Sequence, residues 1–250
     1  MRRILNLIPR PWLILISTWF RPLIKWYYKG SKFIDPIDGS SYRKFLPYGY
    51  QTSRSNALCP GTLSLERHRL LWLYLKRKTT FLKDPLKVLH IAPEQVLFSK
   101  FKSFTHWNYT TTDLQSPLAD IKADICDLPF ENNTYDLILC NHVLEHISND
   151  HMAMQELFRV LKTGGTLIAQ VPIEENRSTT FEDNNIKDKK KRTEIFGQYD
   201  HVRVYGTDYY KRLESVGFKA KGIDFLKEFS HKEIEIYALP KNERIPLAIK

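Results

Sequence analysis

The fold is decided by the stretch KVLHIAPEQ, residues 87–95. Val88, Leu89 and Ile91 are apolar, and the chain breaks at Ala92-Pro93, as the first strand of an open α/β sheet does at its ligand-binding end. The stretch therefore predicts a buried strand that runs directly into a cofactor loop. Such loops are usually rich in glycine, and this one contains none.

The chain beyond this stretch alternates apolar strands with helices. Residues 107–112 and 135–141 predict strands, and the second lacks alternation, so we expect both of its faces to be covered. A helix at 152–162 and a strand at 166–171 follow, and short links between such units favour a parallel, doubly wound sheet. Residues 233–238 alternate polar and apolar side chains, which predicts an exposed antiparallel strand that closes the sheet.

Composition narrows the class of protein. A chain of 250 residues with 42% hydrophobic residues suits one α/β domain with an appendage and argues against disorder. A net charge of +10 fits acidic partners such as anionic lipid, or simply a soluble basic surface. Cys59, Cys126 and Cys140 have no pairing spacing, so we expect no disulfide framework and a cytoplasmic protein.

The first 29 residues are basic and rich in tryptophan and tyrosine. Arg21-Pro22 interrupts the apolar run, which argues against a spanning helix. We interpret residues 1–30 as an amphipathic segment, with residues 1–29 either contacting the inner face of a membrane peripherally or packing on the body of the protein.

Residues 31–63 contain two similar turns, Asp35–Gly39 and Cys59–Thr62. Both have the outline of a zinc-knuckle turn, C-P-x-C-G, but Asp35, Asp38 and Thr62 occupy three of the four thiolate positions. This set would bind zinc poorly, so we interpret the segment as a degenerate zinc ribbon held by packing, or as two unrelated turns. Residues 64–250 are expected to form the α/β domain, which begins with a helix capped by Ser64.

Five motifs follow one another in the order that one enzyme family uses. They are Leu89–Glu94, Asp113 after the second strand, Asp124-Ile125, the segment NHVLEH at 141–146 and the segment LFRVLKTGG at 157–165. In this respect residues 87–173 resemble a class I S-adenosylmethionine-dependent methyltransferase of the type 11 kind. The resemblance implies a Rossmann-like, doubly wound, mostly parallel seven-stranded sheet with an antiparallel last strand, and S-adenosylmethionine as cofactor. The implied cofactor-binding positions are His90, Ala92, Glu94, Asp113, Leu114, Asp124, Ile125, Asn141 and His142.

The residue chemistry agrees with these positions. A carboxylate at Asp113 suits a ribose diol, because its oxygens accept from two hydroxyl groups, although it also suits a cap for the next turn. Glu94 stands where the family has a small residue, and its side chain either binds the amino group of the cofactor or obstructs it.

A competing motif overlaps the family segment. Residues 142–146, HVLEH, satisfy H-x-x-E-H, in which two histidines bind zinc and a glutamate activates water. A zinc hydrolase that uses His142, Glu145 and His146 is therefore an alternative, but the motif follows a buried strand without a clear third ligand. We expect no metal.

A second cluster, GQYDHVRVYG at 197–206, lies where the family borders its acceptor. His201 is a candidate catalytic base, Asp200 would orient it, and Arg203 would hold an anionic acceptor in a bidentate contact. The alternative is a solvated polar turn.

The sequence thus predicts methyl transfer to a small-molecule, lipid-like or otherwise membrane-associated acceptor. A non-catalytic cofactor-binding protein or scaffold remains an alternative because the loop lacks glycine. No nucleic-acid-binding module is recognisable, so we expect no specific nucleic-acid partner.

Overall fold

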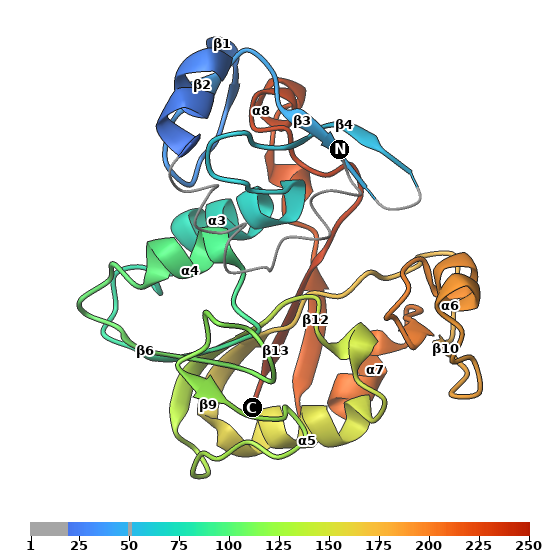
Figure 1. Cartoon of the computed structure of the whole chain (residues 1–250). Helices are drawn as coiled ribbons and strands as arrows, with labels where there is room; N and C mark the ends of the chain where they lie inside the picture. Colours follow the sequence, from blue (N-terminus) through green and yellow to red (C-terminus); the bar gives the residue numbers. More distant parts are fainter. Residues whose placement is uncertain (1–19, 50–51) are drawn as a thin grey trace. The chain divides into compact units, whose positions relative to one another are not determined.

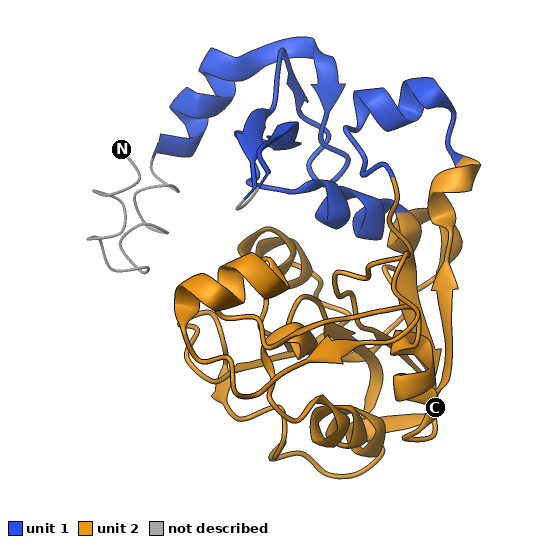
Figure 2. Cartoon of the chain, turned by 90° about the vertical axis from the view of Figure 1, so that its right-hand side faces the viewer, with its two compact units in different colours: residues 1–73, 229–241 blue, residues 74–228, 242–250 orange. Residues whose placement is uncertain are grey.

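The computed structural model describes residues 20–49 and 52–250 of the chain. These residues form two compact units, which Figure 2 distinguishes by colour. Unit 1 takes its residues from the chain up to Leu73 and from Phe229–Lys241, and unit 2 comprises Tyr74–Glu228 and Asn242–Lys250.

Unit 2 is built on one seven-stranded sheet in the order β12-β13-β9-β8-β5-β6-β7. Strands β9, β8, β5, β6 and β7 are parallel, while β13 runs antiparallel to both β9 and β12. This is the expected mostly parallel, Rossmann-like architecture (Figure 1). The strands are β5 (Lys87–Ile91), β6 (Asn108–Asp113), β7 (Ile121–Lys122), β8 (Tyr135–Cys140), β9 (Leu161–Ile168), β12 (Lys219–Ile223) and β13 (Ile245–Ile249).

Helices cover both faces of the sheet. Successive residues of a strand point to opposite faces, so one strand contacts helices on both sides. Leu89 and Ile91 of β5 join a buried apolar cluster with side chains of α5 (Asp150–Val160) and α7 (Tyr209–Glu214). His90 lies near Phe101 of α4 (Gln95–Phe101), with the two rings 6.1 Å apart. Side chains of β5 therefore pack against helices on both faces of the sheet.

Five further short elements of unit 2 lie in the connections between the strands of the sheet. After β9 the chain forms the short strands β10 (Phe181–Glu182) and β11 (Arg203–Val204), which pair antiparallel, with α6 (Lys189–Phe196) between them. Two 3-10 helices, η1 (Leu144–His146) and η2 (Phe225–Glu228), lie after β8 and β12.

Unit 1 consists of two hairpins and helices. Strand β1 (Lys29–Ile34) pairs with β2 (Ser41–Tyr42), and β3 (Leu46–Tyr48) pairs with β4 (Arg54–Leu58). The hairpins meet over a small core of Phe33, Tyr42, Phe45 and Cys59. Residues 20–28 are helical, and α8 (His231–Ile236) is a second helix of this unit. Helix α3 (Glu66–Lys78) begins in unit 1 and ends in unit 2.

Arg69 holds several segments of unit 1 together. Its guanidinium is fully buried and donates to the carbonyls of Ser64, Ala57, Tyr237 and Ala238. The first turns of α3 and the segment around α8 are thereby fastened to the hairpins.

The predicted closing strand at 233–238 is wrong. Ser230 begins α8 with a capping box, in which its hydroxyl accepts from the Glu233 N–H and the Glu233 carboxylate accepts from the Ser230 N–H. This reciprocal cap favours a helix over the strand that the alternating pattern indicated. The antiparallel strand is formed later, by Ile245–Ile249.

The turns at Asp35 and Cys59 lie together in unit 1. The buried Asp35 carboxylate accepts hydrogen bonds from the hydroxyls of Thr62 and Ser64 and from the N–H of Ile37. Burial raises the pKa of the Cys59 thiol to about 11, so the thiol stays protonated near neutral pH. The cysteine side chains at 59, 126 and 140 are all free.

Candidate functional site

The carboxyl ends of four parallel strands lie at one edge of the sheet. Ile91, the last residue of β5, pairs with Thr112 on one side and with Cys140 on the other, and Leu139 pairs with Ile168 of β9. The residues that follow these strand ends therefore stand side by side. In open α/β sheets this edge is where ligands bind.

The loop after β5 takes a backbone conformation that usually belongs to glycine. Ala92 has φ +47°, and its N–H donates to the Thr112 carbonyl at 2.8 Å. The chain therefore makes the sharp turn expected of this loop despite the lack of glycine.

The side chain of Glu94 turns back toward the sheet. One of its oxygens lies 2.8 Å from Nε2 of His90, whose Nδ1 lies 2.7 Å from the Tyr109 hydroxyl. Burial raises the pKa of Tyr109, so its hydroxyl stays protonated and donates to Nδ1, while Nε2–H donates to Glu94. The fully buried His90 thus holds the loop through its contact with Glu94.

Asp113 is half-buried at the end of β6. Its Oδ1 accepts from the N–H groups of Gln115 and Ser116, at 2.6 and 2.5 Å, while Oδ2 has no protein partner among the described residues. The carboxylate therefore caps the turn with one oxygen and leaves the other for a ligand. Leu114, next in the chain, is 62% exposed and offers an apolar surface.

The segment around Asp124 is a tight turn. Oδ1 of Asp124 accepts from the Cys126 N–H at 2.9 Å, and the Ile125 side chain is buried. Glu156 and Arg159 of α5 hold the following residues: Glu156 accepts from the Leu128 N–H, and Arg159 donates to the carbonyls of Leu128 and Phe130. The Glu156–Arg159 ion pair thus holds this loop in place.

The end of β8 places Asn141 and His142. Asn141 is buried, and within the described part of the chain its Nδ2 has no hydrogen-bond partner. His142 has φ +54°, and its Nδ1 lies 3.1 Å from Oε1 of Glu145. His142 precedes η1, so the two histidines of H-x-x-E-H do not share one turn of an α-helix, as the zinc hydrolase motif requires.

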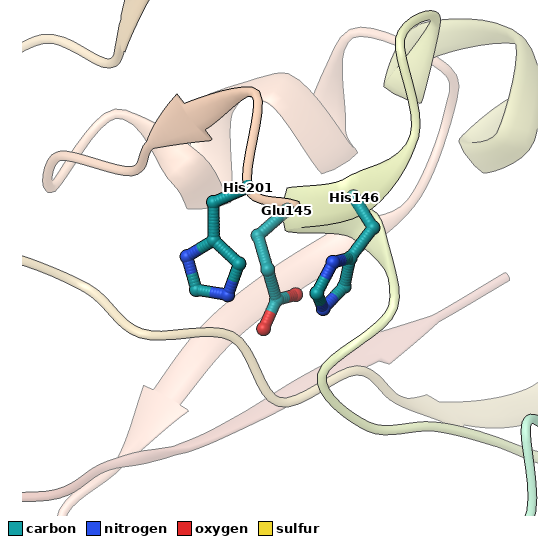
Figure 3. A group of neighbouring side chains, drawn as sticks. All are labelled: Glu145, His146 and His201. Carbon is teal, nitrogen blue, oxygen red and sulfur yellow. The ribbon is translucent and has the colours of Figure 1, made fainter. Parts of the chain in front are cut away.

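Glu145, His146 and His201 converge, although His201 comes from a distant part of the chain. The rings of His146 and His201 are 4.7 Å apart, and in Figure 3 the two imidazoles flank the Glu145 carboxylate. Burial opposes the charge on Glu145, but the hydrogen bond to His142 and the nearby histidines lower its pKa overall, so it remains a carboxylate. Asp200 lies 3.5 Å from Nδ1 of His146.

His201 is held in a defined tautomer. Its Nδ1 lies 3.1 Å from the carbonyl of Phe196, which only accepts, so Nδ1 carries the proton and Nε2 holds the lone pair. Burial lowers the pKa of His201 below its usual value, and the ring is therefore neutral at physiological pH. Asp200 does not bond to His201 as expected but lies against His146 and Gln198.

Arg203 has a structural role in place of the acceptor contact expected of it. Its guanidinium, 1% exposed, donates to the Glu182 carboxylate and to the carbonyls of Leu144, Ile147 and Ser148. These contacts use its N–H groups, and they tie β11 to η1.

Sequence reasoning missed two polar side chains at the same edge. Thr112 Oγ1 and Gln170 Oε1 are buried, and neither has a hydrogen-bond partner among residues 20–49 and 52–250. Both come at or just after a strand end, which is the signal that would have found them. Sequence reasoning placed Glu145 and His146 only in the hydrolase alternative and did not foresee their contact with His201.

Comparison with known proteins agrees with this geometry. Residues 93–169 match the family model described as a methyltransferase domain. An uncharacterized protein of Methanocaldococcus jannaschii is 37% identical over 95 residues, which is 38% of this chain and 39% of that protein. Ajmaline N-methyltransferase of Rauvolfia serpentina is 28% identical over 82 residues, 33% of this chain and 26% of that enzyme. The matched stretches thus span well under half of either relative.

Among solved structures, the [4+2]-cyclase SpnF has the same fold, with a TM-score of 0.50, 13% identity and 94% of each chain covered. The family match lies within unit 2, and the likeness to SpnF, at 13% identity, shows the fold alone.

The residues at the sheet edge suit a polar ligand. One carboxylate oxygen of Asp113 has no protein partner among the described residues, and the unpartnered polar atoms of Thr112, Asn141 and Gln170 lie at neighbouring strand ends. Buried polar atoms without partners are costly, and a polar ligand relieves that cost.

Proposed function

We propose that unit 2 binds S-adenosylmethionine at the carboxyl edge of the sheet and transfers its methyl group to a small or membrane-associated acceptor. The observation that carries this proposal is the row of unpartnered buried polar atoms at the strand ends, on Thr112, Asn141 and Gln170. Ligands of open α/β sheets bind at such strand ends, and beside these atoms Asp113 presents an open carboxylate oxygen.

The residues of the chain would divide the work as follows. Asp113 accepts hydrogen bonds from the ribose, Leu114 covers one face of the adenine, and Asp124 with Ile125 borders its edge. The Ala92 turn and Asn141 face the methionine end. The sulfonium cofactor supplies an already activated methyl group, so the protein mainly aligns the acceptor and excludes water.

The acceptor would bind beside Glu145, His146 and His201, next to the end of β8. The lone pair on Nε2 of His201 is available there, either to take a proton from the acceptor or to bind a cation. The anionic Glu145 would favour cationic or hydrogen-bond-donating groups there.

The N-terminal helix supports a membrane-associated acceptor. Phe20, Leu23, Trp26 and Tyr27 are 55 to 76% exposed, and the spacing of three and four residues places Phe20, Leu23 and Tyr27 on one face of the helix. Basic residues interleave with them, as in helices that lie in the interface of an anionic bilayer. Residues 1–19 of the predicted amphipathic segment lie outside the described residues. No helix within the described ranges is long and apolar enough to cross a membrane.

Vesicle sedimentation tests the membrane contact. We expect the protein to sediment with vesicles that contain phosphatidylglycerol and less with neutral phosphatidylcholine vesicles. Trp26→Glu should reduce this binding, while Tyr48→Ala, an exposed aromatic residue on β3, should leave it unchanged. Equal sedimentation of all three proteins would reject the helix as the contact.

Transfer of label tests the enzymatic proposal. The purified protein is incubated with methyl-tritiated S-adenosylmethionine and either an aqueous metabolite extract or a lipid extract. We expect label in one extract, and less of it with Asp113→Asn at a limiting concentration of cofactor. A protein that binds the cofactor but labels neither extract would support the non-catalytic alternative.

A further inference from the structure

Three side chains in unit 2 form a group of metal-ligating type. One ligand atom from each of Glu145, His146 and His201 lies within 4.8 Å of the other two. Figure 3 shows the carboxylate between the two imidazole rings. Ligand atoms around a tetrahedral ion with bonds of about 2.1 Å lie about 3.4 Å apart, so small side-chain rotations would close the group on an ion.

Each of the three side chains is already held by a second partner. His142 binds Oε1 of Glu145 at 3.1 Å, Phe196 accepts from Nδ1 of His201, and Asp200 lies 3.5 Å from Nδ1 of His146. Each contact leaves the other ligand atom of that side chain available. Metal-binding histidines are usually oriented in this way, by a carboxylate or a backbone carbonyl on the second ring nitrogen.

The remaining oxygen of Glu145 is the strongest sign of a missing ligand. Glu145 is 1% exposed, and its Oε2 has no hydrogen-bond partner among the residues that the structure describes. A buried carboxylate oxygen without a donor is strongly unfavourable unless a cation compensates it. Two imidazole rings, those of His146 and His201, stand beside this carboxylate.

We propose that Glu145, His146 and His201 bind one divalent transition-metal ion. Two imidazole nitrogens and one carboxylate oxygen suit Zn²⁺, Co²⁺ or Mn²⁺, whereas Mg²⁺ prefers oxygen ligands and its own water. Three protein ligands leave coordination positions open, as in catalytic rather than structural sites. His142 is a positioning residue here, which distinguishes the site from the H-x-x-E-H hydrolase motif.

The ion has a direct use if unit 2 transfers methyl groups, and this step rests on the proposed function. Its open positions would take an oxygen of the acceptor, which would fix that oxygen near the methyl donor and lower the pKa of its hydroxyl group. The acceptor class this selects has at least one metal-binding oxygen, such as a phenol or a hydroxy acid.

Titration with the metal alone tests the site. Protein freed of any affinity tag is stripped with chelator and titrated with Co²⁺, following d–d absorption, and with Zn²⁺ by calorimetry. We expect one ion per chain, insensitive to millimolar Mg²⁺. His201→Ala and Glu145→Gln should weaken binding at least about tenfold, and His142→Ala should weaken it less than either.

A control variant and a check of folding accompany this titration. His151→Ala removes an exposed imidazole from α5 and should bind the ion as wild type does. Circular dichroism checks folding, and His201→Asn replaces His201→Ala if that variant unfolds. Wild-type-like binding by a folded His201 variant, no binding by folded wild type, or loss in His142→Ala alone would each overturn the site. S-adenosylmethionine binding, measured separately, shows whether the proposed function stands when the metal site fails.

Discussion

Nε2 of His90 lies 2.8 Å from a carboxylate oxygen of Glu94, and this contact joins a buried strand residue to the loop that would approach the cofactor. The loop lacks glycine, yet Ala92 adopts a left-handed backbone at the same turn. The buried histidine therefore holds the side chain of Glu94 toward the sheet.

Replacing Glu94 should cost stability. In Glu94→Ala the buried Nε2–H of His90 loses its acceptor, and we expect the free energy of unfolding to fall by about 1–3 kcal/mol. Glu94→Gln keeps a carbonyl acceptor and should lose less. Urea denaturation followed by circular dichroism measures both, and equal stability of the alanine variant and wild type would show that the contact is unimportant.

Replacing Asp113 should weaken cofactor binding without unfolding the protein. In Asp113→Asn the remaining oxygen still caps the turn at Gln115 and Ser116, but the charged acceptor for the ribose is lost. We expect the Kd for S-adenosylmethionine to rise about tenfold or more. Asp136→Asn is the matched control, because Asp136 binds Lys87 and Lys162 at the opposite end of the strands. A similar effect from both substitutions would remove the ribose assignment.

The Glu156–Arg159 pair should make stability depend on pH. Hydrogen bonds from Arg159 lower the pKa of Glu156 in the folded protein, so the folded state favours the carboxylate more than the unfolded state does. This stabilisation is present above the ordinary carboxyl pKa of 4.5 and is lost as the pH falls through the lowered folded value. We therefore expect Glu156→Gln to be less stable than wild type at pH 7, with the difference shrinking toward pH 3.

Denaturation at several pH values checks this, with Glu131→Gln as the control on the exposed side of the same loop. A stability difference that stays constant between pH 7 and pH 3 would contradict the assignment. Because the pair also fixes the loop at Leu128, Glu156→Gln should slightly weaken cofactor binding.

Asp35 should be the most sensitive position of unit 1. Its buried carboxylate accepts from Thr62, Ser64 and the Ile37 N–H, and an asparagine amide would turn N–H donors toward the two hydroxyls. We expect Asp35→Asn to lower the free energy of unfolding by about 2 kcal/mol or more. Asp38→Asn, in the same turn but more exposed, should cost less than half as much. Equal costs would show that the Asp35 network does not hold the two turns together.

Local sequence patterns predicted the parallel part of the sheet. Strands β5 and β8 are mostly apolar and have turn residues after them, so their approximate bounds and their burial follow from the residues alone. Asp113 could be placed because it ends the predicted second strand, and Asn141 because it directly follows β8. The closing strand was different, because β13 contains Pro246, a residue that disfavours a strand in the interior of a sheet.

Contacts between distant residues set the rest of the site. The capping box of Ser230 and Glu233 made a helix from an alternating pattern that also suits a strand. Arg203 lies among acidic and aromatic residues in the sequence, but its acceptors are carbonyls of η1 and its neighbours, far away in the chain. The meeting of Glu145 with His201 likewise depends on the N–H of Val202 donating to the Glu145 carbonyl, which no local pattern reveals.

Isothermal titration of the protein with S-adenosylmethionine tests the central claim most directly. We predict that one molecule binds per folded chain and that Asp113→Asn weakens this binding about tenfold or more, while Asp136→Asn does not. The absence of binding heat at millimolar cofactor, at two temperatures and from a sample that circular dichroism shows to be folded, would contradict the claim.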